Sequence, residues 1–273
     1  MESITDVSVR IFEMYHQLEM MQLAGIFEDS LRHAYTVHLR PGDHAIDVGA
    51  HRGLHTLPMA KAVGPRGKVF AVEAAEQTCN KLRAAVNHSE IEDCRKRVQI
   101  FQCAVSDQKG SATFNFVPQA AGLSGLKEQN YPEGAEIVSE TVTVDTLDSL
   151  IADYEKIRFI KLDIEGAEFH ALKGASKLLA SAQPIFAMES GNAGAGERYG
   201  YSREDFFGLM ESLGYDLFSA LGSPFTQAGW GRPAPWYLFG VPRSDPHAYH
   251  RVVLPAIIRS LYEHLPGIHD KRA

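Results

Sequence analysis

The sequence has few cysteines, no surplus of positive charge and no long apolar run. Its 273 residues include three cysteines and carry a formal net charge of -7 at pH 7. Three unevenly spaced cysteines fit neither a disulfide framework nor a paired-cysteine metal site, which favours a reducing compartment. Nucleic acids and anionic membranes are bound by clustered cations, so this acidic chain predicts neither of them as a partner.

No segment has the features of a targeting or membrane-spanning sequence. No run approaches the roughly 20 apolar residues of a membrane helix. The first residues lack a basic segment followed by an apolar stretch and a cleavage site, so we expect a soluble cytoplasmic protein. The zinc motif HExxH and the dinucleotide fingerprint GxGxxG are also missing. The second absence argues against a nicotinamide-dependent oxidoreductase on a Rossmann sheet, which is the nearest rival function.

Short apolar runs alternate with amphipathic segments along most of the chain, a pattern typical of parallel strands joined by crossover helices. It predicts an α/β fold with a doubly wound, mostly parallel sheet of seven strands. The expected strands are residues 44–48, 68–72, 98–104, 159–164, 185–189, 215–220 and 236–241. The expected helices are residues 54–63, 75–88, 167–179, 203–213 and 247–264, with Pro255 kinking or splitting the last one.

Two segments stand outside this alternation. Residues 111–117 and 140–144 predict an inserted pair of strands around the loop 118–135, which is a candidate cover for a substrate. Near the N-terminus, apolar residues recur at helical spacing at Ile4, Val7, Ile11, Met14, Leu18 and Met21. This stripe either packs on its own domain or forms a homodimer contact. We predict a helical extension over residues 1–40 and one large domain over residues 41–273.

The strongest local signal is the run Asp47-x-Gly49-x-x-x-Gly53 between a predicted strand and a predicted helix. Glycines let the backbone approach a ligand closely, and a helix N-terminus favours a negative group. A carboxylate beside this turn suits an amino-acid ligand, whose ammonium it can bind. Glu73 ends the next strand, where an acid can accept hydrogen bonds from ribose hydroxyls. Taken alone, Asp47 is equally well explained as a helix-capping carboxylate, and Glu73 as a solvated residue at the end of a strand. Taken together, the two acids predict a nucleoside ligand with an amino-acid end.

Further carboxylates lie where a later strand is expected to end. Asp163, Glu165 and Glu168 fall within six positions, and Glu189 ends the next predicted strand. Open α/β sheets bind ligands outside the carboxyl ends of their strands, so these acids are expected at the site. Asp163 is the best placed to take a proton from a hydroxyl or, with Glu189, to hold a divalent cation such as Mg²⁺. Glu168 has the competing interpretation of a helix cap.

These motifs resemble the FkbM family of class I S-adenosylmethionine-dependent methyltransferases, over about residues 40–242. The first matching run is shared by many methyltransferases, and the last is specific to the family. The runs are Asp47-Val-Gly49-Ala-His-Arg-Gly53-Leu-His-Thr56, Ala104-Val-Ser-Asp107, Val144-Asp-Thr-Leu-Asp148 and Ile160-Lys-Leu-Asp-Ile-Glu-Gly-Ala-Glu168. The domain over residues 41–273 is then expected to have the class I methyltransferase fold, Rossmann-like, with a β insertion.

The resemblance implies O-methylation of a hydroxyl on a sugar, a polysaccharide or a natural-product small molecule, with S-adenosylmethionine as the cofactor. The residues that it implies for cofactor binding are Asp47, Gly49, Ala50, Gly53, His55, Glu73, Ala104, Ser106, Asp107 and Asp163. Glu73 would bind the ribose and Ala104 would lie near the adenine. The candidates for catalysis are Asp163, Glu165 and His55, and those for a metal are Asp163 and Glu189.

The sequence leaves the acceptor, the general base and the need for a metal open. A rival from another class is a catalytically silent cofactor-binding module that assembles through its N-terminal helix. Binding of S-adenosylhomocysteine together with turnover would separate the enzyme from that module, and stabilisation by NAD instead would favour the oxidoreductase.

Overall fold

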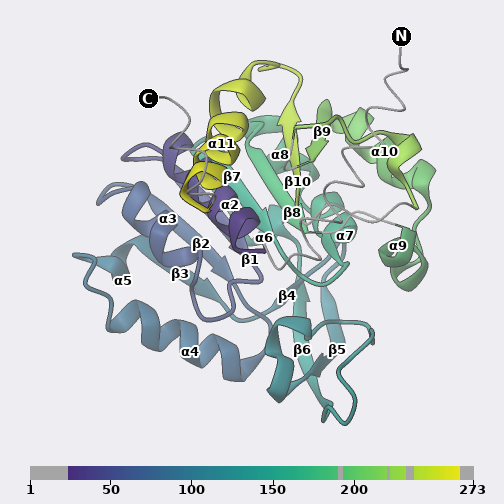
Figure 1. Ribbon diagram of the computed structural model, residues 1–273. Coiled ribbons are helices and arrows are strands. Elements are labelled where there is room, and N and C mark those ends of the chain that lie inside the picture. The colour runs from purple at the N-terminus through teal and green to yellow at the C-terminus, as the bar shows by residue number, and fades with distance from the viewer. Residues whose placement is uncertain (1–23, 190–192, 220–221, 232–236, 265–273) are drawn as a thin grey trace.

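The computed structural model describes residues 24–189, 193–219, 222–231 and 237–264. They form a larger sheet with helices on both faces and a smaller sheet beside one end of it (Figure 1). The apolar stripe between residues 4 and 21 lies outside the described residues. Its contact, and the boundary between residues 40 and 41, therefore stay predictions.

The larger sheet has seven strands in the order β3-β2-β1-β7-β8-β10-β9. Only β10 runs antiparallel to its neighbours, which confirms the predicted mostly parallel sheet. The strands are β1 His44–Val48, β2 Lys68–Val72, β3 Val98–Phe101, β7 Ile157–Leu162, β8 Ile185–Glu189, β9 Tyr215–Ser219 and β10 Tyr237–Pro242. The strand order reverses between β1 and β7, and a crevice for ligands is expected outside their carboxyl ends.

Helices cover both faces of this sheet, so the fold is doubly wound as predicted. One face shares its apolar core with α2 (Ala24–His38), α3 (Thr56–Ala62), α4 (Glu76–Asn87) and α11 (Leu254–His264). The other face packs against α6 (Leu147–Leu150), α7 (Glu168–Lys173), α8 (Ser176–Ala182) and α10 (Arg203–Leu213). The remaining short helices are α5 (Cys94–Arg97), α9 (Ala193–Tyr199), the 3-10 turns Pro118–Leu123 and Gln227–Gly229, and a π turn at Tyr249–Val253.

Two expected elements differ from the structure. The strand expected at 98–104 ends at Phe101, because the apolar run continues into the core of the smaller sheet as β4 (Ala104–Val105). The helix expected at 167–179 is divided at Gly174, where a Cβ would lie 2.1 Å from the Ser106 carbonyl oxygen.

The predicted division of the closing helix is confirmed. A π turn at Tyr249–Val253 precedes α11, which begins at Leu254, so Pro255 lies in a first turn that tolerates its missing N–H.

The predicted insertion is confirmed as a three-stranded sheet of order β4-β6-β5. Its long strands, β5 (Gly110–Phe116) and β6 (Val138–Asp145), pair antiparallel. Phe114 and Val144 pack with Ala75 and Ala104 in a small separate core. The insertion therefore lies beside the end of β2 (Figure 1).

Helix α2 is the described part of the predicted N-terminal extension. Its buried residues Phe27, Leu31 and Tyr35 are at most 2% exposed and belong to the core of the larger sheet. It lies along α11 (Figure 1). This packing brings one side of α2 to the crevice.

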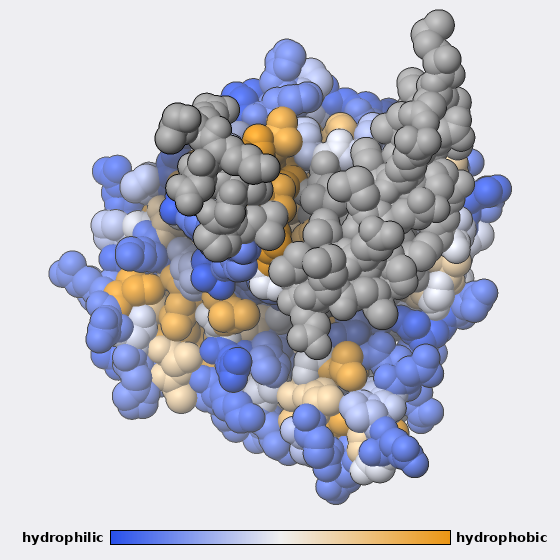
Figure 2. Space-filling model, in the orientation of Figure 1, coloured by the Kyte–Doolittle hydropathy of each residue, from blue (hydrophilic) through white to orange (hydrophobic). Residues whose placement is uncertain are grey.

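The face shown in Figure 2 is mostly hydrophilic, with apolar residues in small groups among the described atoms. The large apolar side chains that are exposed are Val37, Leu54, Ile137, Val138, Ile258 and Tyr262. None of the described helices combines the length and the apolar character that crossing a bilayer requires.

Candidate functional site

A pocket of about 220 Å³ opens at the carboxyl ends of β1, β2 and β7. That volume exceeds what a few water molecules need, so it can take part of a small organic ligand. Its wall combines the turns after these strands, β4, the insertion and one residue of α2. The residues that line it include Glu28, Gly49, Ala50, His51, His55, Glu73, Ala75, Ala104, Phe114, Leu126, Lys161, Asp163 and Glu165.

The glycine turn after β1 needs glycine at its first position. Gly49 has a φ of +73°, and a Cβ there would lie 1.8 Å from the Asp163 carbonyl oxygen. The turn after β1 and the turn after β7 are therefore in direct backbone contact. Gly53 also has a positive φ, +92°, but it faces Leu82 of α4 and does not line the pocket. Of the predicted turn residues, the structure brings Gly49, Ala50 and His55 to the pocket.

Asp47 lies behind the pocket wall and does not line it. The residue is fully buried, and its Oδ2 accepts a hydrogen bond from the Thr56 hydroxyl at 2.5 Å. Its Oδ1 lies 3.6 Å from the Lys161 ammonium. The carboxylate therefore acts on the site through these two neighbours, and its predicted direct contact with a ligand stays a prediction.

Glu73 lies in the pocket wall, as predicted, and is held from both sides. Its Oε2 accepts the His51 backbone N–H at 2.8 Å. Its Oε1 accepts the Ala75 backbone N–H at 3.0 Å and the Thr78 hydroxyl at 2.7 Å. An ionised carboxylate offers about four acceptor positions and three are occupied, so about one is left for a ribose hydroxyl.

The pocket is apolar on one side of Glu73. Ala75, Ala104, Phe114 and Leu126 line this part and belong to the core of the insertion. The structure therefore brings Ala104 to the pocket, and its place near the adenine stays a prediction. It does not bring Ser106 or Asp107 there.

Ser106 and Asp107 form a separate surface cluster. The Ser106 hydroxyl donates to Asp107 Oδ1 at 3.3 Å, and Lys173 Nζ lies 2.8 Å from Asp107 Oδ2. Neither residue lines the pocket. The sequence places them only a few residues after Ala104, but the chain turns away with β4.

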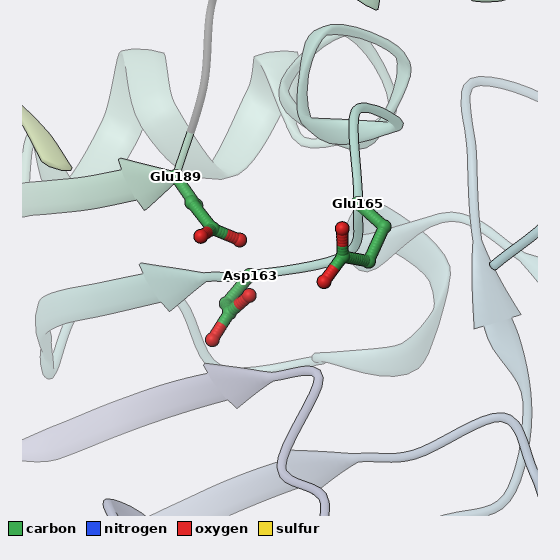
Figure 3. Close-up of side chains that lie close together, drawn as sticks. All are labelled: Asp163, Glu165 and Glu189. Atoms are coloured by element: carbon green, nitrogen blue, oxygen red, sulfur yellow. The ribbon is translucent and has the colours of Figure 1, made fainter. Parts of the chain in front are cut away.

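The other part of the pocket ends in carboxyl groups. One oxygen from each of Asp163, Glu165 and Glu189 lies within 4.8 Å of the others. Asp163 directly follows β7 rather than ending it, and Glu189 ends the neighbouring strand β8 (Figure 3). Glu165 lies on the next turn with a φ of +59°, a backbone strain that is typical of functional sites.

Lys161 is a site residue to which the sequence analysis assigned no role. Its side chain is buried, and its ammonium lies 3.0 Å from Asp163 Oδ2 and 3.6 Å from Asp47 Oδ1. It also donates to the Gly49 carbonyl at 3.0 Å, while Asp47 Oδ1 is an ion-pair partner beyond hydrogen-bond distance. The sequence feature that points to Lys161 is a lysine within a predicted buried strand, because a buried ammonium requires a charged partner.

The pKa values of the neighbouring carboxyl groups Asp163 and Glu189 shift in opposite directions. Burial alone would raise the pKa of Asp163, but the Lys161 ammonium and a hydrogen bond from Glu189 hold that pKa below its ordinary value. Burial and then the Asp163 charge raise the pKa of Glu189 well above its ordinary value. Glu189 is therefore the protonated member of the pair and Asp163 the ionised one.

Glu165 and Glu168 are the two further acids of this segment. Burial raises the pKa of Glu165 to about 7, against the opposing hydrogen bond that Gln129 of the insertion donates at 2.9 Å. Burial also raises the pKa of Glu168 to about 8, and this side chain accepts the Ile164 N–H at 2.8 Å. Glu168 thus fixes the turn that carries Asp163 and Glu165 rather than facing the pocket.

His55 lines the pocket, but both of its ring nitrogens have protein partners. Nε2 lies 2.9 Å from Glu28 Oε2, and Nδ1 lies 3.3 Å from the Tyr35 hydroxyl. Both partners come from α2. Both ring nitrogens are engaged by α2, so the geometry favours Asp163 over His55 as a proton acceptor.

The three carboxyl groups have the oxygen donors that Mg²⁺ prefers. In this arrangement, however, the Lys161 ammonium already neutralises Asp163, and Glu189 holds a proton against it. A metal ion would have to displace both. The residues therefore do not fit a resident cation, and we assign no step to one.

Comparison with known proteins identifies the family. Residues 47–217 match the model of the methyltransferase FkbM domain, which covers more than half of the chain. A 102-residue stretch is 40% identical to 31-O-demethyl-FK506 methyltransferase FkbM of Streptomyces tacrolimicus and spans 37% of this chain and 36% of that protein. A longer stretch of 192 residues is 26% identical to methyltransferase sdnD of Sordaria araneosa and spans 60% of this chain and 73% of that one.

Among solved structures, methyltransferase FkbM from Methylobacillus flagellatus aligns with a TM-score of 0.47 and 18% identity, over 76% of this chain and 47% of that one. The match to the family model includes the glycine turn, Glu73, Lys161 and all the carboxyl groups of the site except Glu28 of α2. The chain belongs to the FkbM family of methyltransferases.

Proposed function

We propose that this protein transfers a methyl group from S-adenosylmethionine to a hydroxyl of a sugar, a polysaccharide or a natural-product small molecule. The observation that carries the proposal is Asp163, held ionised by Lys161 in the pocket wall and in backbone contact with the Gly49 turn. An ionised carboxylate at this place can take the proton of an acceptor hydroxyl. Family membership supports the methyl transfer itself.

The pocket fits the three parts of the cofactor. Its apolar part around Ala104 and Phe114 suits a base, Glu73 suits a ribose hydroxyl, and the charged part around Asp163 suits an amino-acid end. His51 Nε2 is buried in this wall without a hydrogen-bond partner among the described residues. A buried polar atom of this kind is normally satisfied, and a ligand in the pocket can satisfy it.

When bound, S-adenosylmethionine supplies an electrophilic methyl group on a sulfonium. The residues of this chain orient the acceptor oxygen and remove its proton. Orientation is expected to supply much of the acceleration. Asp163 accepts the proton as the new bond forms, while protonated Glu189 donates a hydrogen bond to Asp163 and keeps the pair in place.

The carboxyl groups also favour an acceptor with several hydroxyls. Asp163, Glu165 and Glu189 present hydrogen-bond acceptors at neighbouring positions, and Gln129 brings the insertion to Glu165. Hydroxyl groups on adjacent carbons can donate to such a cluster. The relative named 31-O-demethyl-FK506 methyltransferase supports an oxygen acceptor, since its name describes a substrate that lacks an O-methyl group.

Calorimetric titration with S-adenosylhomocysteine tests the cofactor, and transfer of a radiolabelled methyl group to a panel of sugars and hydroxylated natural products tests the reaction. In Asp163→Asn we expect turnover to fall about 10²- to 10⁴-fold, with little change in cofactor affinity. Asp216→Asn, on exposed residue 216 of β9, is the matched control and should keep full turnover. Stabilisation by NAD without any uptake of S-adenosylhomocysteine would refute the proposal.

A further inference from the structure

The charged part of the pocket contains a carboxylate that lies outside the family match. Glu28 belongs to α2, before residues 47–217, and it lines the pocket together with His55, Lys161 and Asp163. No motif in the sequence pointed to it. It reaches the site because the buried face of α2 packs on the larger sheet.

Two hydrogen bonds fix the Glu28 side chain at the wall. Its Oε2 lies 2.9 Å from His55 Nε2, and its Oε1 accepts the Tyr237 hydroxyl at 3.3 Å. His55 precedes α3, which follows the glycine turn, and Tyr237 begins β10 opposite Glu189. Glu28 therefore joins the glycine turn to the edge of the sheet that carries the acidic residues.

The other carboxylates of this part are held by different partners. Asp47 is turned inward against Thr56 and Lys161. Asp163 is paired with Lys161, and Glu165 accepts a hydrogen bond from Gln129 of the insertion. An amino-acid ligand in the pocket brings an ammonium to the charged part, where a held carboxylate is the group that recognises it.

We infer that Glu28 binds the ammonium group at the amino-acid end of the cofactor, so that α2 completes a pocket which the family-matched region does not complete by itself. This inference rests on the proposed function, because it takes S-adenosylmethionine as the ligand. Asp47 then acts as a positioning residue, which keeps Lys161 and the glycine turn in place.

The test uses ligands that differ only at the amino-acid end. We would measure by calorimetry the affinity of the full chain for S-adenosylhomocysteine, for its deaminated analogue and for 5′-methylthioadenosine, which lacks the amino-acid end. Loss of one charge-assisted hydrogen bond corresponds to about a 10- to 100-fold loss of affinity. We expect that loss for S-adenosylhomocysteine in Glu28→Gln, and no change for 5′-methylthioadenosine.

Asp29→Asn is the matched control. Asp29 is the next residue of α2, its carboxylate pairs with Arg32 and His264, and it does not line the pocket. It should bind all three ligands like the unaltered chain. Thermal unfolding without ligand reports whether each variant is folded.

The outcomes separate the two proposals. If the unaltered chain binds none of the three ligands, the proposed function fails. If it binds them but Glu28→Gln weakens all three equally, or none, the role of Glu28 is wrong. Should Glu28→Gln fail to fold, the unaltered chain still decides: equal affinity for S-adenosylhomocysteine and its deaminated analogue would overturn the inference.

Discussion

Replacing Glu168 with glutamine tests whether this buried acid is neutral in the folded protein. Glu168 is fully buried at the start of α7, its Oε1 accepts the Ile164 N–H at 2.8 Å, and its Oε2 has no partner among the described residues. Burial raises its pKa to about 8. A glutamine has the same shape and keeps the accepted hydrogen bond, so Glu168→Gln mimics the protonated acid.

The size of the effect follows from the shift of the pKa from 4.5 to about 8. Because the folded state binds this proton more tightly, the stabilisation is complete below pH 4.5 and is lost as the pH rises through about 8. One pKa unit corresponds to about 1.4 kcal/mol, so the free energy of unfolding of the unaltered chain should fall, relative to Glu168→Gln, by about 4 kcal/mol between pH 5 and pH 9.

Urea denaturation followed by circular dichroism at several pH values measures this difference. Comparing the two proteins at each pH cancels the titration of the other groups. Glu92→Gln, at an exposed position in the turn before α5, is the control for the substitution itself. A Glu168→Gln variant that is destabilised equally at pH 5 and pH 9 would refute the idea that Glu168 is protonated in the folded chain.

Three further predictions concern the backbone contact, the buried lysine and the metal. Gly49→Ala should abolish binding of S-adenosylhomocysteine, because the added Cβ would lie 1.8 Å from the Asp163 carbonyl oxygen; calorimetry checks this, and unchanged affinity would contradict it. Lys161→Met should lower the free energy of unfolding by about 3–5 kcal/mol, because it leaves Asp47 and Asp163 without their buried partner, whereas an equal loss in a charge-keeping Lys161→Arg would point to packing alone. Treatment with EDTA should leave methyl transfer unchanged, because Lys161 already neutralises Asp163; a loss that Mg²⁺ restores would show a metal site at Asp163, Glu165 and Glu189.

Most of the fold could be predicted from the sequence, because the pattern of apolar residues reports which segments are buried on two faces. The strands at 44–48, 68–72 and 185–189 have the predicted bounds, and so does helix α10. The pattern of apolar residues predicts that a segment is buried, but it does not predict which of the separate cores buries that segment. Ala104 is buried in the core of the insertion, not in that of the larger sheet, and nothing in its neighbours reveals this.

The candidate site could be predicted in part. The acids that follow neighbouring parallel strands had to meet at one edge, and the structure brings Asp163, Glu165 and Glu189 together there. Ser106 and Asp107 were predicted to bind the cofactor because they follow Ala104 in the sequence. In the structure the chain turns away from the pocket after Ala104, and neither residue lines it.

The sequence by itself determined the glycine turn, the acids at the carboxyl ends of strands and the mostly parallel sheet, because each depends on local pattern and on the rules of parallel sheets. Only the tertiary structure decided which carboxylates face a ligand. Whether an acid lines a pocket depends on partners that are distant in the sequence. Lys161 holds Asp47 behind the pocket wall, and the packing of α2 on the larger sheet places Glu28 in that wall.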